Sequence, residues 1–322
     1  MEHGEIKMGL LSNTHAVLSQ NMMWVIFGIS VVVLLVLDLF GFNRKNEEPH
    51  FWHTFWVCIF YIVIAIVFGF FVMYEEGVDK GMLYFTGYLL EKSLSLDNIF
   101  VMSVIFSAIG VPAKYQHRVL FWGILGALVM RGVMIFLGEA LVSRFHWVLY
   151  VFSVFLVYTG AHMLFQKEEE KPFKETKIYQ WMSRIFHVTH EIKGEHFIVK
   201  ENGKWLITPL LFALFIIETM DVIFAFDSIP AIFLVTQDVF IVYTSNIFAI
   251  LGLRALYFLL AAIVNKFAYL KPALSIILIF IGLKIFAPHF GFEVQTWQSL
   301  IFTMLMLTGG IVLSIFKEKK RV

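Results

Sequence analysis

The sequence predicts an all-α polytopic membrane protein with about nine transmembrane helices, its N-terminus outside and its C-terminus inside. Its residues are 59% hydrophobic and 15% charged, whereas an average soluble domain has roughly 45–50% apolar and about 25% charged residues. The mean hydropathy is +0.80. A net charge of +1 gives no global field that would attract nucleic acid. Cys58 is the only cysteine, which excludes an intrachain disulfide and a cysteine-based metal site.

Nine apolar segments approach or exceed the roughly 20 residues that a helix needs to cross a bilayer. They must be helical, because the hydrocarbon region offers no partner for unpaired backbone groups. The eighth is short, so it either tilts little or extends into its flanking residues. The nine segments are Met22–Phe42, Phe55–Tyr74, Met82–Ala108, Leu120–Val142, Val148–Phe165, Ile207–Val235, Phe240–Val264, Ala273–Phe286 and Trp297–Phe316.

The distribution of basic residues sets the orientation. With the N-terminus outside, 18 of the 25 Lys and Arg residues fall in inner segments. The outer segments hold only Lys7, Lys80 and Arg144. Basic residues favour the cytoplasmic side, so this orientation is the predicted one, and it remains so without the long loop.

The predicted spans divide the chain into five parts. These are an N-terminal two-helix segment (1–80), a first three-helix repeat (81–165), a cytoplasmic loop (166–206), a second, inverted three-helix repeat (207–287) and a C-terminal helix with a basic tail (288–322).

The loop contains two short predicted elements. Apolar residues at helical spacing within Glu175–His187 predict an amphipathic helix at the inner membrane surface. The pair Asn202-Gly203 between two short apolar runs predicts a β-hairpin. Four residues, His190, Glu191, Glu195 and His196, lack the His-Glu-x-x-His spacing, so we interpret them as solvated surface rather than as a metal site.

Two polar stretches interrupt the third and sixth apolar segments. They are Glu91–Phe100 and Glu218–Pro230, and both contain an acid, five further residues, then Asp, a short polar residue and Ile. An ionisable side chain at membrane depth costs roughly 2.5–3.5 kcal/mol or more, so such a residue marks a functional site by default.

Each polar stretch begins a similar block of three spans. The middle span carries Arg131 in the first block and Arg254 in the second, and Gly160 or Gly282 lies late in the third span. Since three spans are an odd number, the two repeats must have opposite orientations. Inverted repeats are typical of secondary transporters, whose sites lie near the midplane between the repeats. The alternative is a chance likeness between two polar-marked helices.

The polar stretches supply oxygen ligands for a metal ion. We predict a site that holds or is flanked by Asp97, Asn98, Asp227, Ser228, Glu91, Glu218 and Asp221. Carboxylate, amide and hydroxyl oxygens suit Mn²⁺, Mg²⁺ or Ca²⁺ better than Cu⁺ or tetrahedral zinc. We expect Lys92, Arg131 and Arg254 to neutralise the acids when the site is empty, and Asp38 either lines the cytoplasmic entry or reaches the surface. The alternative is that these groups form structural ion pairs.

The geometry of a helix limits this site. Residues six apart point about 120° away from each other on a helix of 3.6 residues per turn, so Glu91 and Asp97 share a face only where the helix breaks. We expect such a break around Phe226–Pro230, because Asp or Ser can cap a helix start and Pro suits its first turn. If the first stretch is unbroken, Glu91 is a gate or the ion-pair partner of a base.

The same residues resemble the TerC family of integral membrane proteins, and most closely its Alx-type branch. The resemblance runs from about Asp38 to Phe286 and is strongest in three long motifs, Gly87–Phe100, Glu218–Phe233 and Thr244–Phe258. It implies a bacterial inner-membrane protein linked to metal homeostasis. Members of this family are associated with Mn²⁺ export, the alkaline-pH response and tellurite resistance. The resemblance also implies that the two Asp-containing motifs form the ion path.

We therefore expect a transporter that exports Mn²⁺ by alternating access, in exchange for protons, with no permanently bound cofactor. The second hypothesis is a membrane scaffold that assists the assembly or metallation of other membrane or exported proteins, with the loop as its docking surface. An intramembrane enzyme is disfavoured, because the sequence has no His-Glu-x-x-His, Gly-x-Ser-x-Gly or Cys–His arrangement.

Overall fold

A computed structural model describes residues 20–41, 51–165, 173–186, 188–189, 194–201, 204–260 and 269–319, apart from some side chains that include Asp97. The chain divides into two units, Met1–Lys45 and Asn46–Val322. The described part of the first unit is one apolar helix, Gln20–Leu39, which passes into the π-helical turn Leu37–Gly41. Asp38 is a buried residue of that turn.

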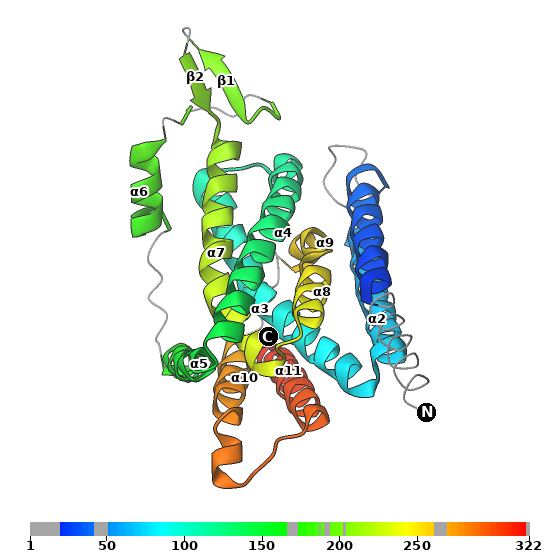
Figure 1. Ribbon diagram of the computed structural model, residues 1–322. Helices are drawn as coiled ribbons and strands as arrows, with labels where there is room; N and C mark the ends of the chain where they lie inside the picture. Colours follow the sequence, from blue (N-terminus) through cyan, green and yellow to red (C-terminus); the bar gives the residue numbers. More distant parts are fainter. Residues whose placement is uncertain are drawn as a thin grey trace. The chain divides into compact units, whose positions relative to one another are not determined.

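The second unit is a bundle of helices with a small hairpin (Figure 1). The long helices are α2 (Phe51–Glu76), α3 (Val78–Ile109), α4 (Ala113–Arg144), α5 (Val148–Phe165), α7 (Pro209–Val235) and α11 (Thr296–Lys319). Shorter elements are α6 (Lys177–Ile185), β1 (Ile198–Glu201), β2 (Lys204–Ile207), α8 (Val239–Ile250), α9 (Leu253–Leu260), α10 (Leu270–Lys284) and the 3₁₀ turns Phe173–Glu175 and Ala287–Phe290.

These elements confirm a polytopic α-helical membrane protein. Within the described residues, seven helices are long and apolar enough to cross a membrane, or eight if the bent pair α8–α9 is one span. The predicted eighth segment corresponds to α10, which has only 15 residues and is shorter than the roughly 20 that a bilayer requires. The count of nine, the orientation and the repeats remain predictions.

The predicted helix break at Phe226–Pro230 is wrong. α7 is continuous from Pro209 to Val235 with Pro230 inside it, and α3 is continuous through Ser95 and Asp97. Pro230 removes one backbone donor, but unwinding would expose several backbone groups where no water can bond them. The bend lies between α8 and α9 instead, where the chain turns by 42° at Gly252, whose φ is +80°.

The helices of the two predicted repeats pack against each other crosswise. α3 packs against α8, α4 packs against α7, and α5 packs against α10. Figure 1 shows α4 and α7 side by side over most of their length. Buried Leu156, Leu274 and Ile277 lie in one apolar cluster, and Ile135, Ile229 and Phe233 in another. This crosswise packing brings the polar stretches of α3 and α7 together.

Two glycines allow α5 and α10 to approach closely. A Cβ atom at Gly160 would lie 2.7 Å from the backbone oxygen of Ser275, and one at Gly282 would lie 2.8 Å from that of Ser153. Ser153 also donates a hydrogen bond to the carbonyl of Gly282. Both serines precede the glycine of their own helix by seven residues, so each helix offers the same pair to the other.

The loop elements match their prediction. α6 lies within the predicted range, and its start is capped by Thr176, which accepts a hydrogen bond from the Tyr179 amide. β1 and β2 pair antiparallel, with Ile198 opposite Ile207, and the predicted turn Asn202-Gly203 between them lies outside the described residues, as do His190 and Glu191. The loop is fixed to α4 by an ion pair of 2.6 Å between Arg118 and Glu195.

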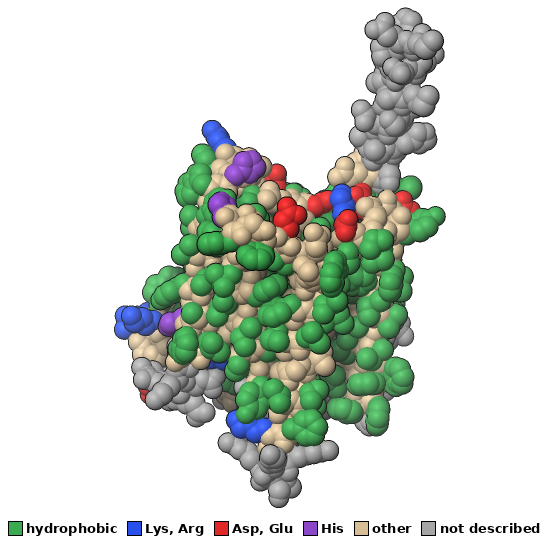
Figure 2. Space-filling view, turned by 90° about the horizontal axis from the view of Figure 1, so that it is seen from below, with side chains coloured by type: hydrophobic (Ala, Val, Ile, Leu, Met, Phe, Trp, Pro, Cys, Tyr) green, Lys and Arg blue, Asp and Glu red, His purple; other side chains and the backbone are tan. Residues whose placement is uncertain are grey.

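The surface fits a lipid environment. On the face seen in Figure 2, hydrophobic side chains cover a broad zone, and charged side chains gather toward its two edges. Among the exposed hydrophobic residues of the molecule are Val133, Phe136 and Leu137 on α4. An apolar belt between polar edges is the surface expected of a bilayer-embedded bundle.

The close contact of α5 with α10 predicts that Gly282→Ala destabilises the protein. The added methyl group would overlap backbone atoms of Ser153, and such overpacking typically costs about 1–3 kcal/mol. We expect a lower melting temperature in detergent. The control is Gly309→Ala, where a Cβ would meet no atom within 4 Å. An unchanged melting temperature for Gly282→Ala would contradict the packing described here.

Candidate functional site

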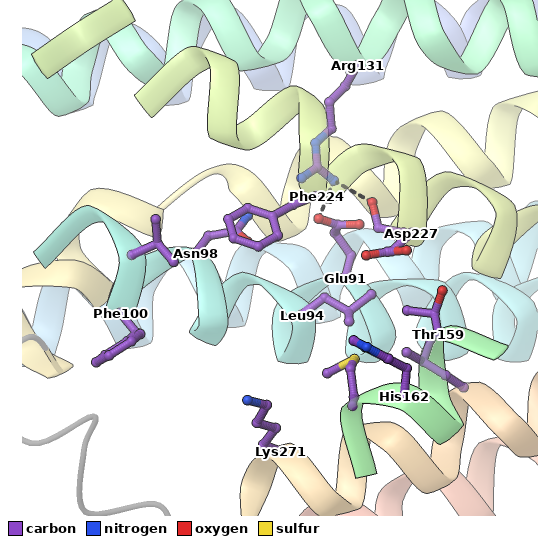
Figure 3. Close-up of a pocket in the computed structure, with 14 residues that line it drawn as sticks. Glu91, Leu94, Asn98, Phe100, Arg131, Thr159, His162, Phe224, Asp227 and Lys271 are labelled. Atoms are coloured by element: carbon purple, nitrogen blue, oxygen red, sulfur yellow. Dashed lines mark hydrogen bonds and ion pairs between the residues drawn. The ribbon is translucent and has the colours of Figure 1, made fainter. Parts of the chain in front are cut away.

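A cavity of about 410 Å³ lies among α3, α4, α5, α7 and α10. Its polar lining includes Glu91 and Asn98 from α3, Arg131 from α4, and Asp227 and Ser228 from α7 (Figure 3). The cavity continues to Lys271 and to His162, whose side chain is exposed. It therefore extends from a buried charged end to the molecular surface.

Arg131 forms the buried end of this cavity. Its side chain is only 1% exposed and forms ion pairs with Glu91 on α3 and, at 3.3 Å, with Asp221 on α7. It also donates hydrogen bonds to the Asn246 side-chain oxygen at 3.0 Å and to the Ser228 hydroxyl at 3.5 Å. These neighbours compensate a positive charge that would otherwise be very costly to bury.

Glu91 and Asp221 occupy matching positions in the two polar stretches, six residues before Asp97 and Asp227. Both converge on the same guanidinium. Because α3 is unbroken, Glu91 is an ion-pair partner of a base, as expected for a continuous helix. The structure thus joins the two stretches through Glu91 and Asp221, the acids that lie six residues before Asp97 and Asp227.

The cavity has further polar groups besides Asp227. Thr159 of α5 lines it together with Asp227. Asn98 donates to the Asp221 carboxylate at a distance of 3.5 Å, and Ser228 lies beside Arg131. The cavity therefore joins carboxylate, amide and hydroxyl oxygens from both stretches. The side chain of Asp97 lies outside the described residues, so its proposed role remains a prediction.

Glu218 lies apart from the main cavity. With Asp221 and Arg254 it lines a second cavity of about 10 Å³, which has room for about one water molecule. Gly123 and Gly126 of α4 leave space for its side chain, since a Cβ at Gly126 would overlap the carboxylate. Glu218 and Asp221 share a helix face as predicted, but only Asp221 connects with the Arg131 cluster.

The remaining charged candidates lie elsewhere. Lys92 donates a hydrogen bond to the Ala249 carbonyl of α8 at 3.1 Å, so it is directed toward α8. Arg254 is buried on α9 beside the small cavity. Asp38 belongs to the first unit. Among the predicted bases, Arg131 forms ion pairs with acids of both polar stretches.

Sequence reasoning missed three contributors. Asn246 accepts a hydrogen bond from Arg131, Thr159 lines the cavity with Asp227, and Lys271 borders the open end of the cavity. Asn246 could have been found, because an amide in the middle of an apolar span needs a partner. Thr159 and Lys271 carry no such signal.

The donor set is suited to a hard cation. Within the part of the chain that the structure describes, no three His, Cys, Asp or Glu side chains are arranged to hold a metal ion. Two of the acids that could contribute, Glu91 and Asp221, are engaged by Arg131. The available oxygen groups belong to Asn98, Asp227 and Ser228, and they suit Mn²⁺, Mg²⁺ or Ca²⁺.

Fold and site together define a polytopic α-helical membrane protein with a buried, charge-compensated polar cavity. The pattern described as "Integral membrane protein TerC family" matches residues 76–322. The chain belongs to this family, as its three motifs indicated.

Several bacterial proteins resemble the chain over almost its whole length. It is 45% identical over 297 residues to an "Uncharacterized membrane protein" of Rickettsia felis, covering 92% of this chain and 98% of the relative. It is 47% identical to "Uncharacterized membrane protein STKORF319" of Myxococcus xanthus, covering 92% and 93%. It is 40% identical to "Putative membrane-bound redox modulator Alx" of Escherichia coli, covering 89% and 92%. No solved structure matches.

The buried ion pair predicts that Glu91→Gln destabilises the protein, because Arg131 would keep its charge and lose one of its two carboxylates. Breaking a buried pair by removing one partner typically costs about 3–5 kcal/mol. We expect a clearly lower melting temperature in detergent, whereas the control Glu293→Gln, at an exposed loop position, should melt like the wild type. Equal melting of Glu91→Gln and wild type would show that the pair does not stabilise the fold.

Proposed function

We propose that the protein exports divalent cations, most specifically Mn²⁺, from the cytoplasm across the bacterial inner membrane by alternating access. The observation that carries the proposal is the cavity of about 410 Å³ lined by oxygen ligands of both polar stretches. Polar groups at membrane depth are costly and belong to ion or substrate paths by default. Asp227, Asn98 and Ser228 are the proposed ligands, joined by Asp97, while Glu91, Asp221 and Glu218 flank the path.

The packing supports two inverted repeats. In this arrangement α3 corresponds to α7, α4 to the bent pair α8–α9, and α5 to α10. The contacts of α3 with α8 and of α4 with α7 are then equivalent, and α5 meets its own counterpart through Gly160 and Gly282. Glu91 and Asp221 are likewise counterparts that meet at Arg131. A site between inverted repeats is the arrangement from which alternating access arises.

The ends of the cavity support loading from the cytoplasm. His162 and Lys271 border its surface end, and the predicted orientation places both at the inner membrane face. At the predicted outer face, Lys80 of α3 pairs with Glu76 and, at 2.8 Å, with Asp238, which caps the start of α8. This ion pair ties the start of α3 to the second repeat at the outer face, so we assign the arrangement to the inward-facing state.

Exchange for protons fits the chemistry of the ligands. A carboxylate that releases a cation to the outside can take up a proton, which restores neutrality at membrane depth. We therefore propose antiport of Mn²⁺ and protons. The word "redox" in the name of the Escherichia coli relative suggests another class of activity. With Cys58 as its only cysteine, this chain cannot form an internal dithiol pair.

The transport proposal predicts that Asp227→Asn and Asp97→Asn abolish Mn²⁺ uptake into inside-out vesicles, because the cation loses a charged ligand. Uptake should fall to the level of vesicles without the protein, at equal protein content. Asp79→Asn, which changes an exposed carboxylate on α3, is the matched control and should transport normally. Full uptake by both test variants would exclude the proposed ligand set.

The scaffold hypothesis has one supporting observation. Two tryptophans of the loop elements, Trp181 of α6 and Trp205 of β2, are 61% and 72% exposed, and exposed aromatic residues are enriched in binding surfaces. The transport proposal predicts that Trp205→Ala leaves both Mn²⁺ uptake by vesicles and Mn²⁺ tolerance of cells unchanged. Loss of tolerance in cells with normal vesicle uptake would favour the scaffold instead.

A further inference from the structure

We propose that Arg131 is a tethered cation that competes with the transported ion for Glu91 and Asp221, so that only a divalent cation loads the site by displacing it. This inference rests on the proposed transport function and adds a specificity-determining residue to it. The guanidinium neutralises two carboxylates that flank the proposed ligands Asp227, Asn98 and Ser228, as a bound metal ion would.

The geometry of the Arg131 side chain suits a group that competes with the transported cation. Its planar fork engages carboxylates from α3 and α7 at the same time, which a point-like ammonium does less well. It lines the cavity together with Glu91, Ser228 and Asp227. A cation entering from the open end therefore meets Glu91 and Ser228, two of the side chains that contact Arg131, whereas Asp221 lines the neighbouring small cavities.

The cluster is only partly satisfied, which separates it from a purely structural clamp. Within the described part of the chain, Arg131 Nε and Asp221 Oδ2 are buried and have no hydrogen-bond partner. The contacts of Arg131 with Asp221 and Ser228 are long, at 3.3 and 3.5 Å. Buried polar groups are normally paired, and an incomplete network stabilises the fold less than a saturated one. Arg131 can therefore exchange its carboxylate partners more easily than a residue in a saturated network.

After it leaves the two acids, the guanidinium can still bond to Asn246, which is not among the proposed ligands of the ion. Arg131 donates to the Asn246 side-chain oxygen at 3.0 Å, and Asn246 is a neutral, fully buried residue of α8. Arg131 can keep this hydrogen bond while it leaves the two acids. Coulomb energy scales with the product of the charges, so a divalent ion gains twice what a monovalent ion gains at the same distance. The competition therefore selects for charge.

The test compares Mn²⁺ binding and transport for wild type, Arg131→Gln and Arg131→Lys in purified full-length protein, with MnCl₂ as the probe. Without the competitor, Arg131→Gln should bind Mn²⁺ about tenfold more tightly, a typical coupling between two bound groups. Its KM should fall and its kcat should fall as well, because the ion is no longer expelled by the returning guanidinium. The matched control is Arg144→Gln, which removes an exposed charge from the end of the same helix.

Each outcome decides the proposal. Folded Arg131→Gln that binds Mn²⁺ with unchanged or weaker affinity overturns it. If Arg131→Gln does not fold, Arg131→Lys decides, since its single ammonium frees one acid and should lower the KM severalfold. An unchanged or raised KM for Arg131→Lys overturns the proposal. Absence of Mn²⁺ binding and transport by the wild type would instead refute the transport function itself, which makes the two failures distinguishable.

Discussion

Arg131 places a full positive charge inside a bundle of apolar helices. Neighbouring side chains of opposite charge must compensate it. Glu91 comes from α3 and Asp221 from α7, so the ion pairs join the two polar stretches into one cluster. In the arrangement described here, the two carboxylates offset the cost of burying the guanidinium. The register of α3, α4 and α7 therefore depends on this interaction.

Small residues allow the helices around the Arg131 ion pairs and the cavity to pack closely. Gly160 and Gly282 bring α5 and α10 into backbone contact, and Gly123 and Gly126 leave room for Glu218 beside α4. Interfaces of small residues are typical of membrane helices, which lack a hydrophobic driving force between them. The contact between α5 and α10 holds in place two of the helices that line the cavity, and the cavity reaches the exposed residue His162.

The sequence predicts α5 to the residue, the amphipathic helix α6 and the hairpin β1–β2, because apolar periodicity and turn chemistry are local signals. It also predicts that the two polar stretches meet. It does not predict which acids meet, since that depends on how α3 and α7 rotate about their axes when α4 inserts Arg131 between them. Pro230 was misleading for a related reason: within a bilayer the continuous helix is the less costly arrangement.

The central claim is that α3 and α7 contribute to one cation site beside Arg131. The most direct measurement is the location of Mn²⁺ by anomalous diffraction from crystals of the full-length protein soaked in MnCl₂. The account predicts a peak in the cavity within coordination distance of Asp227 and of an oxygen from α3. A peak only at the loop, or none in a cavity where Arg131 still holds Glu91 and Asp221 at saturating Mn²⁺, would contradict it.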